Sequence, residues 1–217
     1  MTDSFKQNGF LVVRNYLDQI GLDLNILQEY FYLKASSTKI KDDPQTPGSV
    51  NYYSDLLTET ILKISKPNFE KLTGYSLLPT YSFSRLYLKG NKLKKHTDRM
   101  AAEISGTLCV DYSGEYKSEI YMSPTDKESD ATKIILNPGD LCLYDGIKMW
   151  HWRDRIKNNW LLHIFLHYVD AEGDKKDLIY DQRSYLGLPS INDKEFKQGH
   201  TSDYFKEYIS NAYRPPA

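Results

Sequence analysis

Three side chains in this 217-residue sequence have the types and the spacing of a metal site. His96 and Asp98 are two positions apart, and His151 follows 53 positions after Asp98 (151 − 98 = 53). In an extended segment the side chains at positions i and i+2 point to the same face, so His96 and Asp98 can offer an imidazole nitrogen and a carboxylate oxygen to one ion. If the fold returns the chain to this place at His151, the three side chains form the facial set that is typical of non-haem Fe(II) oxygenases, with three coordination positions left open.

A histidine and an aspartate at this spacing also occur by chance, so the surrounding elements decide whether the prediction holds. Short apolar runs, separated by turn residues, follow one another through the middle of the sequence and predict strands at residues 81–88, 104–110, 119–122, 133–136, 141–144, 149–156 and 160–169. Seven strands at this spacing indicate an antiparallel sandwich or jelly roll with helices packed outside it. His151 follows a Pro-Gly-Asp turn and the run 141–144.

The first third of the chain predicts helices and one short strand. We expect the strand at residues 10–14, one helix over 18–32, and a second helix that begins near Ser54, is interrupted or kinked at Pro67, and ends at Gly74. The apolar stripe predicted for the first of these helices consists of Leu22, Ile26, Tyr30 and Leu33. The polar segment 39–51 contains two prolines and a glycine and is predicted to be a surface loop that could cover a pocket.

Length and composition favour one domain over residues 1–217, with helical support at 1–74, a β core at 75–170 and a C-terminal extension at 171–217 that could form a short helix over 202–213. The 28 basic and 29 acidic residues leave a net charge of −1, which gives no global reason to expect nucleic acid or an acidic membrane as a partner. Cys109 and Cys142 lie in apolar runs, where free cysteines are buried, and this favours a reducing cytoplasm. We expect neither secretion nor a membrane span, because no signal-like start and no apolar run of about 18 residues is present.

Four segments together resemble a known family. They are residues 81–99 (Tyr-Ser-Phe-Ser-Arg-Leu-Tyr-Leu-Lys-Gly-Asn-Lys-Leu-Lys-Lys-His-Thr-Asp-Arg), 136–146 (Leu-Asn-Pro-Gly-Asp-Leu-Cys-Leu-Tyr-Asp-Gly), 150–153 (Trp-His-Trp-Arg) and 165–170 (Phe-Leu-His-Tyr-Val-Asp). This part of the chain, roughly 77–170, resembles the prolyl-hydroxylase-type branch of the Fe(II)/2-oxoglutarate-dependent dioxygenases.

The resemblance implies a mainly β fold with a double-stranded β-helix core, a jelly roll of the cupin type. It also implies that Fe(II) is held by His96, Asp98 and His151, and that 2-oxoglutarate and dioxygen are the co-substrates. The reaction implied is oxidative decarboxylation of 2-oxoglutarate to succinate and CO2, coupled to hydroxylation of a peptidyl or small-molecule substrate.

The sequence departs from this family at Leu161, which stands where an arginine or lysine usually holds the far carboxylate of 2-oxoglutarate. A buried carboxylate still needs a cation or strong donors. Arg85 is preferred for this role, with the Tyr87 hydroxyl beside it, because both alternate along the strand that leads to His96. Arg153 competes with Arg85, because it lies two positions after His151. For each arginine the alternative is a surface ion pair.

His163 and His167 alternate along the last predicted strand and could also line the pocket, although a histidine in such a strand is more often a hydrogen-bonded interior residue. Arg99 could orient the neighbouring Asp98 or face the solvent.

Two other functions remain open. A cupin-like metal isomerase, or a dioxygenase that works without 2-oxoglutarate, would account for Leu161. A non-catalytic jelly-roll binding module would require that the three predicted ligands never meet. The sequence carries no signal for an oligomeric state.

Overall fold

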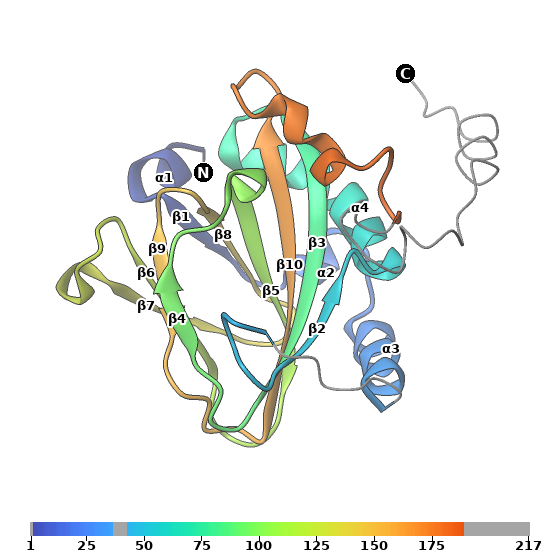
Figure 1. The fold of residues 1–217 in the computed structure, drawn as a ribbon, viewed down its shortest axis with the longest axis vertical. Helices are drawn as coiled ribbons and strands as arrows, with labels where there is room; N and C mark the ends of the chain where they lie inside the picture. The colour runs from blue at the N-terminus through green and yellow to red at the C-terminus, as the bar shows by residue number, and fades with distance from the viewer. Residues whose placement is uncertain (1, 37–42, 189–217) are drawn as a thin grey trace.

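The fold consists of two antiparallel sheets that face each other, seen in a computed structural model that describes residues 2–36 and 43–188 (Figure 1). The larger sheet has the strand order β1-β8-β5-β10-β3-β2, and the smaller one has the order β4-β9-β6-β7. The strands are β1 (Phe10–Val13), β2 (Val50–Tyr53), β3 (Leu77–Leu88), β4 (Leu93–His96), β5 (Ile104–Tyr112), β6 (Ser118–Ser123), β7 (Thr132–Leu136), β8 (Leu141–Asp145), β9 (Trp150–Arg153) and β10 (Trp160–Asp170). The predicted mainly β jelly roll is confirmed.

Two apolar layers stabilise this arrangement. The inner layer fills the space between the sheets with alternate residues of the strands, among them Cys109, Met122, Cys142 and Phe165. The outer layer lies between the larger sheet and the helices, which are α1 (Thr2–Asn8), α2 (Tyr16–Gln19), α3 (Leu24–Ser36) and α4 (Leu56–Thr73). Because β3, β5 and β10 are covered on both faces, nearly every residue of β5 and β10 is buried.

The single helix expected over residues 18–32 is wrong. The chain forms α2 and α3 instead, because Gly21 takes a left-handed backbone conformation (φ 68°) that ends the first helix. The predicted apolar face is half right: Leu22 and Tyr30 pack against the outer layer, but Ile26 and Leu33 are exposed, and Leu27 and Phe31 are buried there instead.

Helix α4 follows the prediction except at its proline. Asp55 caps its first turn through hydrogen bonds from the amides of Leu57 and Thr58, and Gly74 ends it in the left-handed conformation (φ 76°). The helix nevertheless runs through Pro67 without interruption. Its buried face, which includes Phe69, packs on the larger sheet and outweighs the loss of one backbone hydrogen bond.

Two strands were missed and some boundaries differ. The strand β2 begins in the last two residues of the segment 39–51 that was predicted as loop and continues to Tyr53. The strand β4 provides His96 although only its first residue is apolar. The strand β3 begins four residues earlier than expected, and β9 is shorter than the predicted 149–156. Residues 202–213, predicted as a short helix, lie outside the described residues. Within the described ranges, none of the helices combines the length and hydropathy that a membrane span requires.

Candidate metal centre

The three predicted ligands meet at one point between the two sheets. His96 ends β4 and His151 lies on β9, and these two residues are paired across the antiparallel ladder. Asp98 follows β4 by two residues. The Nε2 atoms of His96 and His151 lie 3.6 Å and 3.4 Å from Asp98 Oδ1, and one ligand atom of each residue lies within 4.8 Å of the others. Two imidazole nitrogens and one carboxylate oxygen at this separation fit a mononuclear metal such as Fe(II).

The backbone holds both imidazole rings in the orientation that a metal needs. His96 Nδ1 lies 2.7 Å from the carbonyl oxygen of Lys94, and His151 Nδ1 lies 3.0 Å from that of Met149. When each Nδ1 carries the proton and donates it to the carbonyl two residues earlier, the Nε2 lone pair points to the centre. Metal-binding histidines are commonly held in this way.

Asp98 is held by its neighbours as well. The Ser105 hydroxyl lies 3.0 Å from Asp98 Oδ2 and 2.9 Å from His167 Nδ1, and the Asp98 amide donates to the carbonyl of Gly146 at 2.7 Å. A β-carbon on Gly146 would lie 2.8 Å from Asp98 Oδ2 and 2.1 Å from the carbonyl oxygen of Ala102. Position 146 therefore admits only glycine without a shift of the backbone.

Electrostatics keep the carboxylate ionised. Burial raises the pKa of Asp98, but the charge of His151 and hydrogen bonds from His151 and His96 outweigh this and hold it well below its usual range. Burial lowers the pKa of His151, yet the same interaction with Asp98 raises it above the ordinary value. For His167, burial is the dominant effect and lowers the pKa to about 4, so this ring is neutral at pH 7.

A cavity of about 320 Å³ opens beside the three ligands. Aromatic side chains form much of its wall, and Tyr53 and Tyr81 stack with their ring centroids 5.5 Å apart. Arg85, Arg99 and Gln45 add polar groups to the lining. The cavity leaves room next to the three ligands for small molecules.

The four residues predicted to bind the co-substrate form one cluster at the edge of this cavity. The guanidinium groups of Arg85 and Arg153 lie 5.5 Å and 5.3 Å from the centroid of the Tyr87 ring, and His163 Nδ1 lies 3.1 Å from Arg153. Burial, followed by the charges of the two arginines, holds the pKa of His163 well below its ordinary value. Of these four residues Arg85 lines this cavity, Arg153 lines a second cavity together with Glu119 and Leu161, and Tyr87 and His163 are buried.

The two arginines differ in their partners. Arg85 forms an ion pair with Asp43 at 2.6 Å and donates to the side-chain oxygens of Asn51 and Gln45. Arg153, which is 2% exposed, donates to the Ser118 hydroxyl and the Glu119 carbonyl oxygen. Within the part of the chain that the structure describes, no carboxylate lies within ion-pair distance of Arg153.

Two donors of the cluster are left unsatisfied. Arg153 Nε and the Tyr87 hydroxyl are buried and have no hydrogen-bond partner among the described residues. Leu161, at the position of the missing cation, is itself buried in the inner layer. An anion that enters the cluster would therefore find two free donors, the Nε–H of a buried guanidinium and a phenolic hydroxyl.

Sequence reasoning missed three residues that contribute to the site. Ser105 and Gly146 support Asp98, and Asp181 accepts hydrogen bonds from Arg99 and Tyr53 at the cavity. The motif Tyr-Asp-Gly that ends at residue 146 carries a signal only through the family resemblance, and its spacing alone does not indicate a contact with Asp98. Asp181 had no local signal, because its partners lie 82 and 128 positions away in the sequence.

Comparisons with known proteins give a structural likeness only. No family model and no curated protein matches the sequence. Among solved structures, a Pseudomonas putida prolyl-4-hydroxylase has a TM-score of 0.54 at 13% identity and covers 76% of this chain and 96% of its own.

Two further structures agree with this likeness. A 2OG-Fe(II) oxygenase family oxidoreductase from Burkholderia pseudomallei has a TM-score of 0.58 at 14% identity, with 77% and 88% of the two chains covered. HygX from Streptomyces hygroscopicus, solved with nickel and 2-oxoglutarate bound, has a TM-score of 0.59 at 10% identity, with 78% and 86% covered. The chain therefore has the fold of the Fe(II)/2-oxoglutarate oxygenases, including that of the prolyl hydroxylases.

Proposed function

We propose that this protein is a non-haem Fe(II)- and 2-oxoglutarate-dependent dioxygenase that hydroxylates a peptidyl or small-molecule substrate. The observation that supports this most directly is the convergence of His96, Asp98 and His151 beside a cavity, with both histidine Nε2 atoms directed at the carboxylate. The bound metal would supply the sites for co-substrate and dioxygen and the oxidising power, with succinate and CO2 as co-products.

The residues of this chain contribute geometry and shielding. His96, Asp98 and His151 would hold one face of the metal and leave the cavity side open. Ser105 and Gly146 fix the carboxylate, so that its position does not depend on the metal alone. The aromatic wall restricts water around the reacting centre, which favours reaction with the bound substrate.

We assign the far carboxylate of 2-oxoglutarate to Arg153 and Tyr87. A buried guanidinium without an anionic partner is costly, and Arg153 is in that condition, whereas Arg85 is already neutralised by Asp43. This assignment reverses the order that we expected from the sequence, in which Arg85 ranked first. A cytoplasmic location belongs to the same proposal, because Cys109 and Cys142 are both free and buried.

The decisive experiment follows the fate of labelled 2-oxoglutarate. Succinate and CO2 should form only when Fe(II), dioxygen and 2-oxoglutarate are all present, and His151→Ala should abolish their formation. Addition of 2-oxoglutarate should also change the absorption spectrum of the anaerobic Fe(II) protein. A protein that binds Fe(II) without this spectral change would instead be a metal enzyme independent of 2-oxoglutarate, which is the alternative that Leu161 leaves open.

A pair of matched variants tests the carboxylate assignment. Arg153→Met should weaken 2-oxoglutarate binding by about 2–5 kcal/mol, since it leaves a buried carboxylate without its charge partner, while Arg85→Met should change it by less than about tenfold. Both are read from titrations of the anaerobic Fe(II) protein, with circular dichroism to establish that each variant folds. The opposite ranking would assign the carboxylate to Arg85.

A further inference from the structure

The segment 180–188 has an unusual backbone beside the cavity. Three consecutive residues with side chains, Tyr180, Asp181 and Gln182, take left-handed conformations with φ of 54°, 56° and 61°. Residues other than glycine seldom adopt this conformation, and a run of three persists only where the surrounding structure determines it. The place of Asp181 is therefore fixed by contacts elsewhere in the fold.

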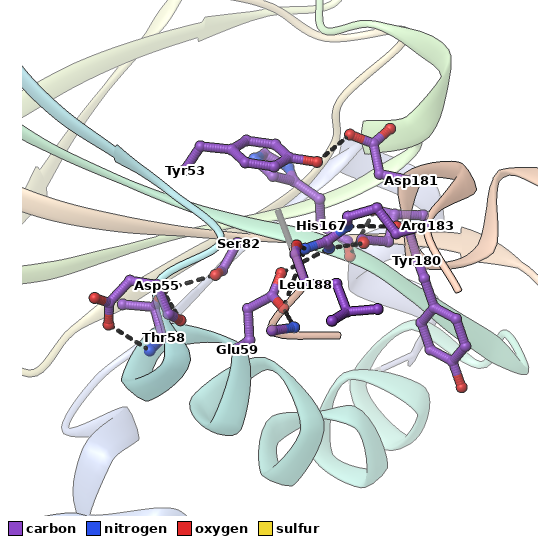
Figure 2. A network of polar contacts seen from close by, with 12 residues as sticks. Tyr53, Asp55, Thr58, Glu59, Ser82, His167, Tyr180, Asp181, Arg183 and Leu188 are labelled. Atoms are coloured by element: carbon purple, nitrogen blue, oxygen red, sulfur yellow. Dashed lines mark hydrogen bonds and ion pairs between the residues drawn. The ribbon is translucent and has the colours of Figure 1, made fainter. Parts of the chain in front are cut away.

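Those contacts centre on Arg183, which is buried together with Glu59 of α4 (Figure 2). Both Nη atoms of Arg183 donate to the Glu59 carboxylate, at 2.7 Å and 3.3 Å. The remaining N–H groups donate to the carbonyl oxygens of Thr80, Tyr180 and Leu188, so that all five donors of the guanidinium are used. Glu59 also accepts from the amide of Gly187. These hydrogen bonds hold the segment 180–188 against α4 and β3.

The hydrogen bonds of Arg183 and Glu59 place the Asp181 carboxylate where it accepts hydrogen bonds from two residues of the cavity wall. Arg99 donates to both of its oxygens at 2.6 Å. The Tyr53 hydroxyl donates to one of them at 2.5 Å (Figure 2). The Arg99 guanidinium lies 4.1 Å from the centroid of the Tyr81 ring. Arg99 is thus held from two sides, by an ion pair and by an aromatic face.

The position of Arg99 matters because it directly follows the predicted ligand Asp98 and lines the same cavity as all three ligands. An uncompensated guanidinium there would repel a divalent cation, and if it were mobile it could pair with the Asp98 carboxylate in place of the metal. Asp181 cancels its charge and keeps it against Tyr81. In the same wall Arg85 is neutralised by Asp43.

We propose that Asp181 is a positioning residue for the metal centre, which holds and neutralises Arg99 so that Asp98 stays available to the cation. The inference rests on the proposed function in one respect, namely that the centre binds a divalent metal. It predicts that, when Asp181 loses its charge, the centre binds a divalent cation more weakly and an anion such as 2-oxoglutarate more tightly.

The test compares Asp181→Asn with Asp177→Asn in the full chain. The control has the same change of charge, at an exposed position four residues earlier for which the structure shows no hydrogen bond or ion pair among the described residues. Isothermal titration calorimetry with Mn²⁺ should give a dissociation constant about three- to tenfold higher for Asp181→Asn and unchanged for Asp177→Asn. On Mn²⁺-saturated protein, 2-oxoglutarate should bind more tightly to Asp181→Asn than to the original chain, because the freed Arg99 attracts its carboxylates.

Two additional variants separate this effect from damage to the fold. The double variant Arg99→Gln/Asp181→Asn should return both dissociation constants to within about twofold of the original values. Arg99→Gln alone leaves Asp181 without its cation and should tighten Mn²⁺ binding, which keeps the proposal testable if Asp181→Asn does not fold.

Weakening of both ligands in Asp181→Asn, with no recovery in the double variant, would overturn the inference and leave Asp181 with a purely structural role. Equal values for Asp181→Asn and Asp177→Asn would overturn it as well, while the proposed function would stand. A chain that binds no Mn²⁺ at all would refute the proposed metal centre and the inference with it.

Discussion

Replacing Gly146 by alanine is the substitution whose effect follows most directly from the geometry of the metal centre. The added β-carbon would lie 2.1 Å from the carbonyl oxygen of Ala102, 2.7 Å from the Ser105 hydroxyl and 2.8 Å from Asp98 Oδ2. Carbon and oxygen atoms in contact are normally at least about 3.2 Å apart, so the segments must separate by about 1 Å. The carbonyl of Gly146 also accepts from the amide of Asp98, and its shift will displace the carboxylate.

Two magnitudes follow from this displacement. Overpacking of this kind costs about 1–3 kcal/mol of folding free energy, which lowers the Tm of a chain of this length by about 2–4 °C for each kcal/mol. Disturbing a group that holds a metal ligand in place typically lowers metal affinity by about 10–100-fold, which corresponds to about 1.4–2.8 kcal/mol. The loss of metal affinity should therefore be large while the protein remains folded.

Calorimetric titration with Mn²⁺ and a thermal melt of the metal-free protein measure the two effects separately. Gly173→Ala is the matched control, since its β-carbon would approach only Asp170, at 3.2 Å, and its backbone is not left-handed. We expect the control to bind Mn²⁺ like the original chain. If Gly146→Ala binds Mn²⁺ with unchanged affinity, the claim that this glycine positions Asp98 is refuted.

Two further predictions concern stability. The pKa of His167 is about 4 in the folded protein, below the ordinary 6.5. As the pH falls, the unfolded chain therefore takes up this proton before the folded protein does. The free energy of unfolding of the metal-free protein should fall by about 3 kcal/mol between pH 6.5 and pH 4. Urea titrations at pH 7.0 and 4.5 should show a smaller fall in His167→Gln, and an equal fall in both proteins would contradict the assignment. Arg183→Met should lower the free energy of unfolding by about 3–5 kcal/mol, because Glu59 would be left charged and buried. The control is Lys148→Met, which removes the ion pair with Asp145. Because the Lys148 side chain is 73% exposed, this change should cost less than about 1 kcal/mol. Similar losses in these two variants, measured by urea denaturation, would show that the buried pair contributes no more than a surface pair.

Most of the strands, and the convergence of His96, Asp98 and His151, could be predicted because much of the signal is local. Alternating apolar residues and turn residues predict most of the strands, and the spacing of His96 and Asp98 places both on one face of an extended segment. The β4 strand was missed because two lysines follow its first residue, and it is defined by pairing with β9 across the site.

Elements whose position depends on tertiary contacts could not be predicted. In α3 the apolar residues occur on more than one face, so that spacing alone selected Ile26 and Leu33 rather than the buried Leu27 and Phe31. Our proposal of Arg153 in place of Arg85 depends on Asp43, whose carboxylate reaches Arg85 from a loop that carries no signal for this contact in the sequence. Asp181 depends on partners far away in the sequence and on the buried Arg183.

The way in which the imidazole rings are held has a consequence for how freely this sequence could change in the course of evolution. Both rings are oriented by carbonyl groups of the main chain two residues earlier, and a carbonyl is present whatever amino acid occupies that place. The carboxylate, in contrast, depends on a particular hydroxyl and on a position without a side chain. Substitutions at the exposed Lys94 should therefore be tolerated widely, and those at the buried Met149 are limited by packing and not by its role toward His151. Ser105 and Gly146 should tolerate few substitutions, and the centre could persist through extensive sequence divergence as long as those two residues remain.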